Sequence, residues 1–369
     1  MEKVRIGIVG CGCISDIYLT NLTRVFENVE VVGVCDLIRE RAENACKEYG
    51  VTKIYDDVDA LLADPAVEIM LNITQPPNHG WLNLKALEAG KNIYVEKPLA
   101  LNREDGLKIK KLAEKKNLLA GGAPDTFLGS GIQTCRKLIE DGWIGRPVGA
   151  TAFMMCHGHE SWHPDPEFYY EAGGGPMFDM GPYYLTALVN LLGPVASVSG
   201  SAAVSFPTRT ITSEKKYGKV VNVEVPTYVA GLLNFQNGAI GTIITSFDVW
   251  AAELPRIEIY GSEGTLSVPD PNTFEGPIRF RKAGSQEWAE IPLLYEYSQN
   301  SRGLGLADMA MALRTGRKHR ANISLTCHVL DIMQGIHDAS REGITYRLET
   351  SCEKPTVMPI GLLKGKIDE

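Results

Sequence analysis

The sequence lacks long hydrophobic runs, an excess of basic residues and a recognisable leader segment. No apolar stretch approaches the ~18 residues that a membrane-spanning helix needs, so we expect no membrane partner. Lysine and arginine total 37 against 45 acidic residues, a net charge of −8, which lacks the basic footprint of nucleic-acid-binding proteins. Because the chain runs directly into an apolar strand pattern, we also expect no secretion signal.

Cysteine is present, but its spacing marks neither a metal site nor a disulfide framework. Of the eight cysteines, Cys11 and Cys13 lie inside a glycine turn where small side chains are needed, so we expect packing rather than redox chemistry there. Unpaired cysteines are typical of a reduced compartment, and we predict a cytoplasmic protein. The hydrophobic content of 44% and the length of 369 residues fit a soluble enzyme of two domains.

The most informative motif is a Gly-x-Gly turn at the end of the first apolar run. Gly10 permits a tight turn, and Gly12 has no Cβ, so a pyrophosphate can approach the backbone at the start of the following helix. The turn therefore predicts a dinucleotide site that includes Gly10, Gly12, Cys13 and Ile14.

A carboxylate after the second strand indicates that the dinucleotide is NAD. Asp36 ends the second apolar strand about 20 residues beyond the glycines, where an acid binds the ribose 2′-hydroxyl of NAD and repels the 2′-phosphate of NADP. Arg39 and Arg41 lie close by and keep NADP as the less favoured alternative. A structural glycine turn in another α/β domain is the remaining interpretation.

Two patterns of secondary structure divide the chain. In 1–122, strands and helices alternate, which predicts a doubly wound parallel Rossmann sheet that binds NAD(P). In 123–369, β-rich segments separated by turns predict a second α/β domain, with a large, open, mostly antiparallel sheet, for substrate binding and oligomerisation. Late helices at 304–313 and 325–341 are expected to pack near the first domain. The uncovered sheet face is a natural surface for homo-oligomerisation.

Five motifs follow one another in order: residues 6–12, Asp36, and residues 96–100, 173–181 and 260–266. Together they resemble the glucose–fructose oxidoreductase/inositol dehydrogenase/rhizopine-catabolism (Gfo/Idh/MocA) family, over essentially the whole chain. The resemblance implies an NAD(P)-dependent dehydrogenase or reductase of sugars, cyclitols or their derivatives. It also implies a Rossmann domain and a second α/β domain whose open sheet mediates dimers or tetramers.

Lys97 follows a strand of the parallel sheet, so we expect it in the crevice where such sheets bind ligands. Oxidising a secondary alcohol requires removal of the hydroxyl proton, which the cofactor does not accept. A desolvated lysine with a lowered pKa can bind the reacting oxygen and relay that proton, and the resemblance implies this role for Lys97. A surface lysine is the alternative. Glu96 is expected near the nicotinamide ribose or, equally, as the ion-pair partner of another lysine.

Asp179 and Tyr183 are four residues apart and would share one face of a helix. Pro182 is tolerated only in a first helical turn, so Asp179 is alternatively a plain N-cap. The family pattern is Asp-x-Gly-x-His, in which the histidine accepts the proton, and Tyr183 replaces it here. A phenol, with an ordinary pKa of about 10, is a poor base unless a cation such as Lys97 lowers that pKa. Otherwise Asp179, Lys97 or another histidine takes the proton.

A histidine-rich loop at 156–166 supplies candidates for that histidine. We predict that His157, His159, Trp162 and His163 bind substrate, because an aromatic face stacks on pyranose C–H groups while polar side chains bind hydroxyls. A metal site is one alternative, although the spacing matches no standard site. A polar loop without a ligand is the other.

Four further positions complete the predicted site. Asp125 lies where many relatives carry a basic residue, and an acid there favours neutral polyhydroxyl substrates over carboxylates. Thr74 and Pro76 are expected along the cofactor, and so is His79, unless it only starts a helix.

We interpret the sequence as that of an NAD-preferring oxidoreductase acting on a secondary hydroxyl of a sugar, sugar derivative or glycoside. The predicted catalytic residues are Lys97, Asp179 and Tyr183. One alternative is a family member that keeps NAD bound and cleaves or epimerises a glycoside by transient oxidation. Another is a non-catalytic NAD-binding sensor or scaffold.

Overall fold

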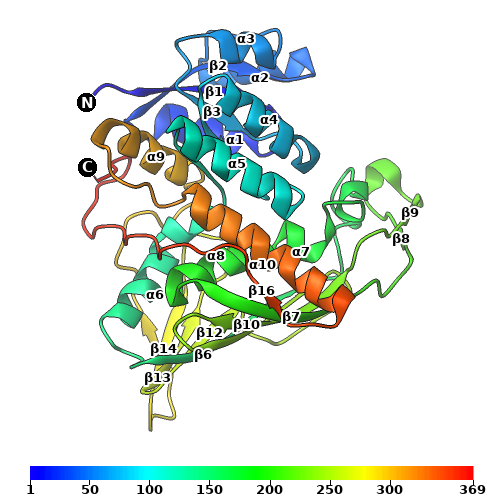
Figure 1. Cartoon of the computed structure of the whole chain (residues 1–369), viewed down its shortest axis with the longest axis vertical. Helices are drawn as coiled ribbons and strands as arrows, with labels where there is room; N and C mark the ends of the chain where they lie inside the picture. Colours follow the sequence, from blue (N-terminus) through cyan, green and yellow to red (C-terminus); the bar gives the residue numbers. More distant parts are fainter. Residues whose placement is uncertain (369) are drawn as a thin grey trace.

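The computed structural model describes residues 1–368, and its first sheet is the predicted Rossmann sheet (Figure 1). Five parallel strands lie in the order β2-β1-β3-β4-β5. Their strand order reverses beside β1, which is where open α/β sheets bind ligands. The strands are β1 (Val4–Val9), β2 (Val29–Cys35), β3 (Ile69–Asn72), β4 (Asn92–Val95) and β5 (Ala120–Gly122). The helices are α1 (Ser15–Arg24), α2 (Arg39–Tyr49), α3 (Val58–Ala63), α4 (His79–Glu88) and α5 (Arg103–Lys116).

The second sheet has nine strands in the order β15-β14-β13-β12-β6-β11-β10-β7-β16 and is antiparallel except for the pair β6–β11. The predicted large, mostly antiparallel sheet is confirmed. Its central strands are β6 (Pro147–Met155), β7 (Val195–Ala203), β10 (Tyr228–Phe235), β11 (Ile240–Ser246), β12 (Ile257–Gly261) and β13 (Gly264–Val268). Its outer strands, which were not predicted from the sequence, are β14 (Ile278–Lys282), β15 (Ala289–Ile291) and β16 (Tyr346–Arg347). A separate two-stranded sheet pairs β8 (Thr208–Thr210) with β9 (Val220–Asn222).

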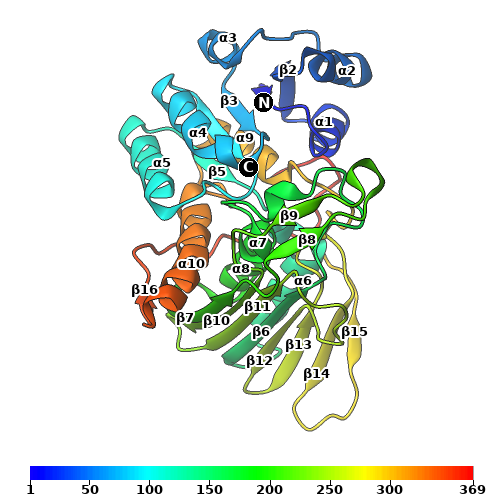
Figure 2. The ribbon, with the colours of Figure 1, turned by 90° about the vertical axis from the view of Figure 1, so that its right-hand side faces the viewer.

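Helices cover one face of the large sheet and lie between it and the Rossmann sheet (Figure 2). They are α6 (Ser130–Glu140), α7 (Gly175–Asp179), α8 (Gly181–Leu192) and α10 (Ile323–Glu342). In the described residues no helix covers the opposite face, so this sheet is open, as predicted. The last two helices return to the first sheet, because α9 (Leu304–Thr315) contacts β1 and β5 while α10 contacts α5.

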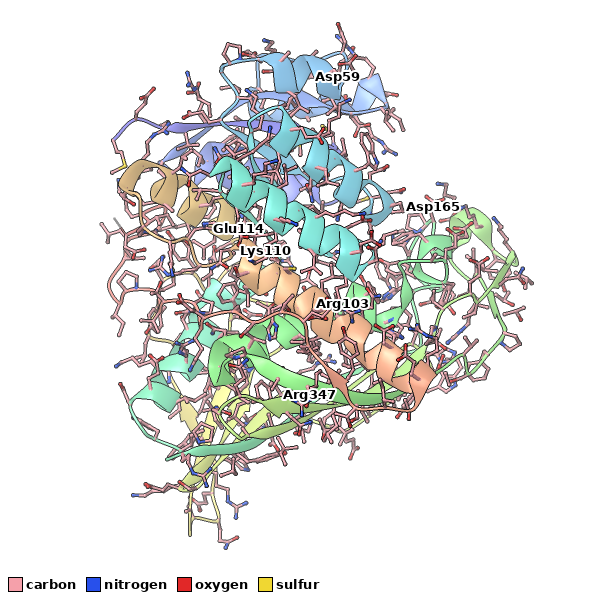
Figure 3. The ribbon with its side chains drawn as sticks, in the orientation of Figure 1. Asp59, Arg103, Lys110, Glu114, Asp165 and Arg347 are labelled. Atoms are coloured by element: carbon pink, nitrogen blue, oxygen red, sulfur yellow. The ribbon has the colours of Figure 1, made fainter. Side chains whose placement is uncertain are left out.

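Arg103 joins the two halves of the molecule at the start of α5 (Figure 3). Its Nε lies 2.5 Å from Oδ1 of the buried Asp331, and its Nη2 lies 2.9 Å from Oδ2 of Asp338. Both carboxylates belong to α10. A guanidinium paired with two carboxylates holds its partners in one geometry, so these ion pairs fix α10 beside the loop that carries Lys97.

The division of the chain at residue 122 stays a prediction. β5 pairs with β4, yet Gly121 also forms a bridge with Asn322, just before α10. Within residues 1–368, no helix is both long enough and apolar enough to cross a bilayer.

Candidate active site

The glycine turn leaves open space in front of α1. Gly10 has φ +103°, and a Cβ there would lie 2.8 Å from the carbonyl oxygen of Ile73, so only glycine fits without strain. A Cβ on Gly12 would meet nothing within 4 Å. This space at the start of α1 fits a pyrophosphate, which backbone N–H groups and the helix dipole favour there. Cys13 and Ile14 are exposed beside the same space.

Asp36 is held at the end of β2 by two backbone bonds. Its Oδ2 accepts the N–H of Cys11 at 2.6 Å and its Oδ1 accepts the N–H of Ile38 at 2.7 Å. The carboxylate is therefore fixed next to the glycine turn. Arg39 is turned towards other carboxylates, with Nη1 2.9 Å from Oδ1 of Asp56.

A pocket of about 660 Å³ lies between the Rossmann sheet and the second sheet. This volume is in the range of small-molecule sites. The pocket brings together many of the predicted residues: Ile14, Thr74, Pro76, Glu96, Lys97, His159, Trp162, Asp179 and Tyr183.

Lys97, Asp179 and His159 form a continuous polar chain in this pocket. The Nζ of Lys97 lies 2.7 Å from Oδ1 of Asp179 and donates to the carbonyl oxygen of the same residue at 2.7 Å. The Nε2 of His159 lies 3.2 Å from Oδ2 of Asp179. The carboxylate thus contacts the ammonium with one oxygen and the imidazole with the other.

Ion pairing determines the protonation states of Lys97 and Asp179. Burial alone would raise the pKa of Asp179, but the Lys97 ammonium and the hydrogen bond from His159 outweigh it and lower that pKa to about 2. Burial alone would lower the pKa of Lys97, but Asp179 outweighs it and raises that pKa. The expected lowering of the Lys97 pKa is therefore wrong, and Lys97 is an ammonium that donates hydrogen bonds.

Two family models match the chain. Residues 4–121 match the oxidoreductase family with an NAD-binding Rossmann fold, and residues 132–267 match the GFO/IDH/MocA C-terminal domain. The chain belongs to the Gfo/Idh/MocA family. The predicted resemblance is confirmed, and the protein is an oxidoreductase of an NAD-binding family.

Named relatives within the Gfo/Idh/MocA family include two inositol dehydrogenases. The chain is 24% identical over 263 residues to myo-inositol 2-dehydrogenase of Thermotoga maritima, covering 71% of this chain and 74% of the relative. It is 26% identical over 269 residues to scyllo-inositol 2-dehydrogenase (NAD(+)) of Bacillus subtilis, covering 72% and 74%. Among solved structures, an NAD-binding oxidoreductase from Klebsiella pneumoniae superposes with a TM-score of 0.82, 19% identity, and coverage of 94% and 99%. That last likeness shows the fold.

Tyr183, which replaces the usual histidine of the Gfo/Idh/MocA pattern, lines the pocket beside Lys97. The Nζ of Lys97 lies 5.5 Å from the centre of its ring. Burial nevertheless outweighs this cation and raises the pKa of Tyr183. Asp179 is the last residue of α7, and the N-cap of α8 is Met180. The N-cap interpretation of Asp179 is therefore wrong.

Glu96 fixes the backbone of Lys97 against α1. Its Oε1 accepts the hydroxyl of Tyr18 at 2.8 Å, and its Oε2 accepts the N–H of Lys97 at 2.9 Å. In the part of the chain that the structure describes, Glu96 makes no ion pair with a lysine, so that alternative is wrong. The carboxylate lines the pocket beside the start of α1.

Two predicted contact residues are buried outside the pocket. Asp125 is 1% exposed, and its Oδ2 accepts the N–H groups of Gly303 and Gly305 at 2.8 and 3.0 Å. Its predicted contact with substrate is therefore wrong, and so is the argument for neutral substrates that rested on it. His79 is fully buried, with Nδ1 2.6 Å from the oxygen of Pro98 and Nε2 2.9 Å from the oxygen of Thr74. It connects the two loops rather than lining the pocket.

Only some of the predicted residues of the histidine-rich loop line the pocket. His157 stacks on Trp250, with ring centres 3.4 Å apart, and His163 accepts the N–H of Asp165 with Nδ1 at 3.0 Å. Neither lines the pocket, so the structure does not support their predicted contact with substrate. Trp162 lines it and is 61% exposed. Within residues 1–368, no three histidine, cysteine or acidic side chains form a group that could hold a metal ion.

The sequence did not indicate several residues that complete the pocket. The charged ones are Arg256, Asp270 and Arg302. They lie in strand ends and loops without a recognisable motif. The one local feature beside them is Gly303, which follows Arg302 and precedes α9. Its φ of +100° shows that the chain turns there.

Proposed function

We propose that this protein is an NAD-dependent dehydrogenase acting on a secondary hydroxyl of a sugar, sugar derivative or glycoside. The observation that carries the proposal is the Lys97–Asp179–His159 chain in a pocket of about 660 Å³ beside the glycine turn. The inositol dehydrogenases among its relatives support this substrate class.

Lys97, Asp179 and His159 each have a separate role in the proposed reaction. The Lys97 ammonium donates a hydrogen bond to the hydroxyl oxygen and stabilises the negative charge that develops there. Lys97 is already protonated, so the proton must go elsewhere. His159 donates its Nε2 proton to Asp179, which leaves Nδ1 as the base that accepts the hydroxyl proton. Asp179 then stabilises the imidazolium.

The residues around the glycine turn hold the cofactor. NAD held there would supply the acceptor for the hydride of the carbinol carbon. Asp36 is positioned for the ribose, where its charge disfavours a 2′-phosphate, and Arg39, one of the two arginines close by, is engaged by Asp56. We therefore propose NAD rather than NADP. Trp162 offers an aromatic face to the C–H groups of a sugar ring.

The test is NADH formation at 340 nm across a panel of polyols, sugars and glycosides, with Lys97→Met as the variant. We expect Lys97→Met to lower kcat by about 10²–10⁴-fold while the Kd for NADH changes less than about threefold. The control is Lys85→Met, because Lys85 lies on α4 away from the pocket and pairs with the exposed Asp59 of α3. Its activity should equal that of the wild type.

Other outcomes separate the alternatives. Turnover of a glycoside without net NADH formation would identify an enzyme that retains NAD and uses transient oxidation. NADH binding without turnover of any compound would identify a sensor or scaffold. Equal activity of the wild type and Lys97→Met would contradict the mechanism proposed for Lys97, Asp179 and His159.

A further inference from the structure

Arg302 is a pocket cation without a carboxylate partner. Its Nη1 donates to Oδ1 of Asn300 at 2.9 Å, and its Nη2 donates to the backbone oxygen and Oδ1 of Asn272 at 3.2 and 2.6 Å. All three acceptors are neutral. In the described residues, no carboxylate oxygen lies within 4.0 Å of this guanidinium.

The other two basic side chains of the pocket are paired. Lys97 contacts Asp179 at 2.7 Å, and the Nε of Arg256 lies 3.3 Å from Oδ2 of Asp270. The carboxylates of Asp125 and Glu96 act on Arg302 from beyond 4.0 Å but make no hydrogen bond with it, so this guanidinium can still form a charge-assisted hydrogen bond with a ligand anion. Within residues 1–368, the contacts with Asn300 and Asn272 use three of the N–H groups of Arg302 and a hydrogen bond to Tyr183 uses another, so one donor remains for a ligand.

The backbone around Arg302 is fixed from two sides. Asn21 of α1 donates its Nδ2 to the carbonyl oxygens of Asn300 and Arg302 at 3.1 and 2.8 Å. Asp125 accepts the N–H groups of Gly303 and Gly305 directly after it. A donor whose backbone is fixed loses less conformational entropy when it binds a ligand. Asp125 is thus a positioning residue for Arg302.

Tyr183 lies close to both Arg302 and Lys97. The Cζ of Arg302 is 6.0 Å from the centre of the Tyr183 ring, and the Nζ of Lys97 is 5.5 Å from the same centre. Both cations line one pocket. A molecule the size of one sugar can therefore contact Lys97 with a hydroxyl and Arg302 with a second group.

We propose that the substrate is a sugar acid whose carboxylate binds Arg302 while the hydroxyl to be oxidised lies on Lys97. This inference rests on the proposed dehydrogenase function and adds the class of its substrate. The carboxylate is not changed in the reaction. The carbinol C–H gives its hydride to NAD and the hydroxyl gives its proton to His159, so the product is the keto acid.

The experiment compares matched acids and neutral sugars: D-glucuronate with D-glucose, and D-galacturonate with D-galactose. Isothermal titration of each compound into the full-length protein saturated with NADH gives the Kd, and initial rates at 340 nm with NAD⁺ give kcat/KM. We expect at least one acid to bind about 10- to 100-fold more tightly than its neutral partner, the gain of one charge-assisted hydrogen bond. Glucose 6-phosphate tests whether a phosphate serves instead of a carboxylate, which would overturn the sugar-acid assignment.

The matched variants are Arg302→Gln, Arg302→Lys and the control Arg279→Gln, a residue outside this pocket. Arg302→Gln should abolish the preference for the acid and leave binding of the neutral sugar within about threefold. Arg302→Lys should restore part of the preference. Arg279→Gln should behave like the wild type.

Three results would overturn the inference. They are equal affinity for acid and neutral sugar in every pair, an acid preference that survives in Arg302→Gln, and a loss of NADH affinity in Arg302→Gln. The last would assign Arg302 to the cofactor. Tight, Arg302-dependent binding of an acid without NADH formation would instead contradict the proposed function while keeping the carboxylate site.

Discussion

The Nε2 of His159 lies 3.2 Å from Oδ2 of Asp179, so an imidazole contacts this carboxylate although Tyr183 stands where the family pattern has a histidine. The Gfo/Idh/MocA pattern places the histidine four residues after the aspartate. Here the histidine comes from a loop 20 residues before Asp179. In this structure the carboxylate orients the imidazole, which is the condition for a general base.

The first prediction separates His159 from Tyr183. His159→Asn keeps a polar side chain but removes the base, so we expect kcat to fall by about 100-fold or more. Tyr183→Phe removes a phenol whose pKa is raised by burial, and kcat should change less than about fivefold. Steady-state rates at 340 nm measure both variants. A large loss in Tyr183→Phe with a small one in His159→Asn would reverse the assignment.

The cofactor half of the site could be predicted because its signals are local. Gly10 and Gly12 follow a strand, and Lys97 follows another strand of the same parallel sheet. Since the carboxyl ends of parallel strands meet at one edge, the sequence placed these residues together. The structure confirms that Ile14, Thr74, Pro76 and Lys97 line one pocket.

The choice among the three loop histidines depended on contacts that leave no local signal. The backbone oxygen of Glu160 accepts the N–H groups of Thr212 and Ser213 at 3.0 and 2.7 Å, and its Oε1 contacts Nη1 of Arg209 at 3.2 Å. These bonds join the loop to the distant β8–β9 segment. They determine that His159 faces Asp179. The prediction for Asp125 failed for the same reason, because its burial against Gly303 involves a segment far along the chain.

The second prediction concerns the open face of the large sheet. Leu232 on β10 and Ile240 on β11 are 41% and 54% exposed, on strands that pair directly. Apolar side chains on an uncovered sheet face favour association. We expect the wild type to be a dimer or tetramer by light scattering, and Leu232→Glu with Ile240→Glu to be smaller.

The control for this prediction is Leu37→Glu, because Leu37 is fully exposed and lies next to Asp36, far from the large sheet. It should leave the oligomer intact. An unchanged mass in the double variant, or a monomeric wild type, would exclude this face as the interface.

The third prediction is a dependence of stability on pH through His328. Its Nε2 accepts the N–H of Val195 at 3.0 Å, which requires the neutral ring, and burial lowers its pKa to about 4. In the unfolded chain the pKa is about 6.5. Between these values the unfolded state binds the proton and the folded state does not, so stability falls as the pH decreases. The stabilisation is complete above about pH 6.5, and about 3 kcal/mol is lost by pH 4.

Urea unfolding of the wild type and His328→Gln from pH 4 to pH 8 measures this effect. The difference in the free energy of unfolding between the two proteins removes the contribution of other titrating groups. It should be largest at pH 7–8 and shrink by about 3 kcal/mol towards pH 4. A difference that does not vary with pH would show that His328 does not titrate in this range.

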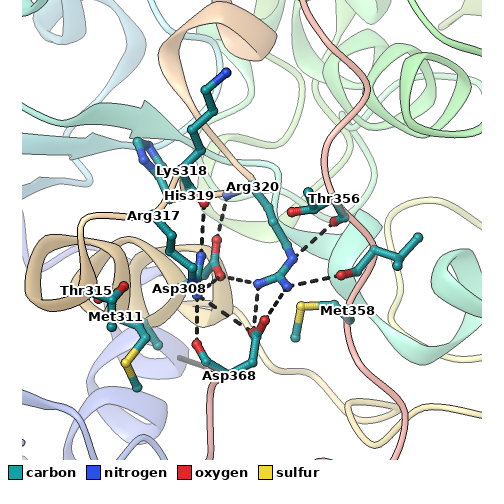
Figure 4. A network of polar contacts seen from close by, with 12 residues as sticks. Asp308, Met311, Thr315, Arg317, Lys318, His319, Arg320, Thr356, Met358 and Asp368 are labelled. Atoms are coloured by element: carbon teal, nitrogen blue, oxygen red, sulfur yellow. Dashed lines mark hydrogen bonds and ion pairs between the residues drawn. The ribbon is translucent and has the colours of Figure 1, made fainter.

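The fourth prediction concerns a buried ion network that holds the segment near residue 368 against the end of α9 (Figure 4). Arg320 is 4% exposed and contacts both Oδ1 of Asp308 at 2.5 Å and Oδ2 of Asp368 at 2.6 Å. Asp308 is fully buried and also pairs with Arg317 at 2.7 Å. Removing the Asp308 carboxylate would leave Arg317 and Arg320 without their buried partner. Leaving a buried charge unpaired is what makes breaking a buried ion pair costly in free energy.

We expect Asp308→Asn to lower the free energy of unfolding by about 3–5 kcal/mol, and Asp368→Asn by about 1–3 kcal/mol because Arg320 keeps Asp308. The matched control is Lys318→Ala, since Lys318 pairs with Glu353 at the surface and both side chains are more than 80% exposed. Its effect should stay within about 0.5 kcal/mol. Denaturant unfolding of the three variants at pH 7 gives these values. Equal losses in Asp308→Asn and Lys318→Ala would show that the network contributes no more than a surface ion pair.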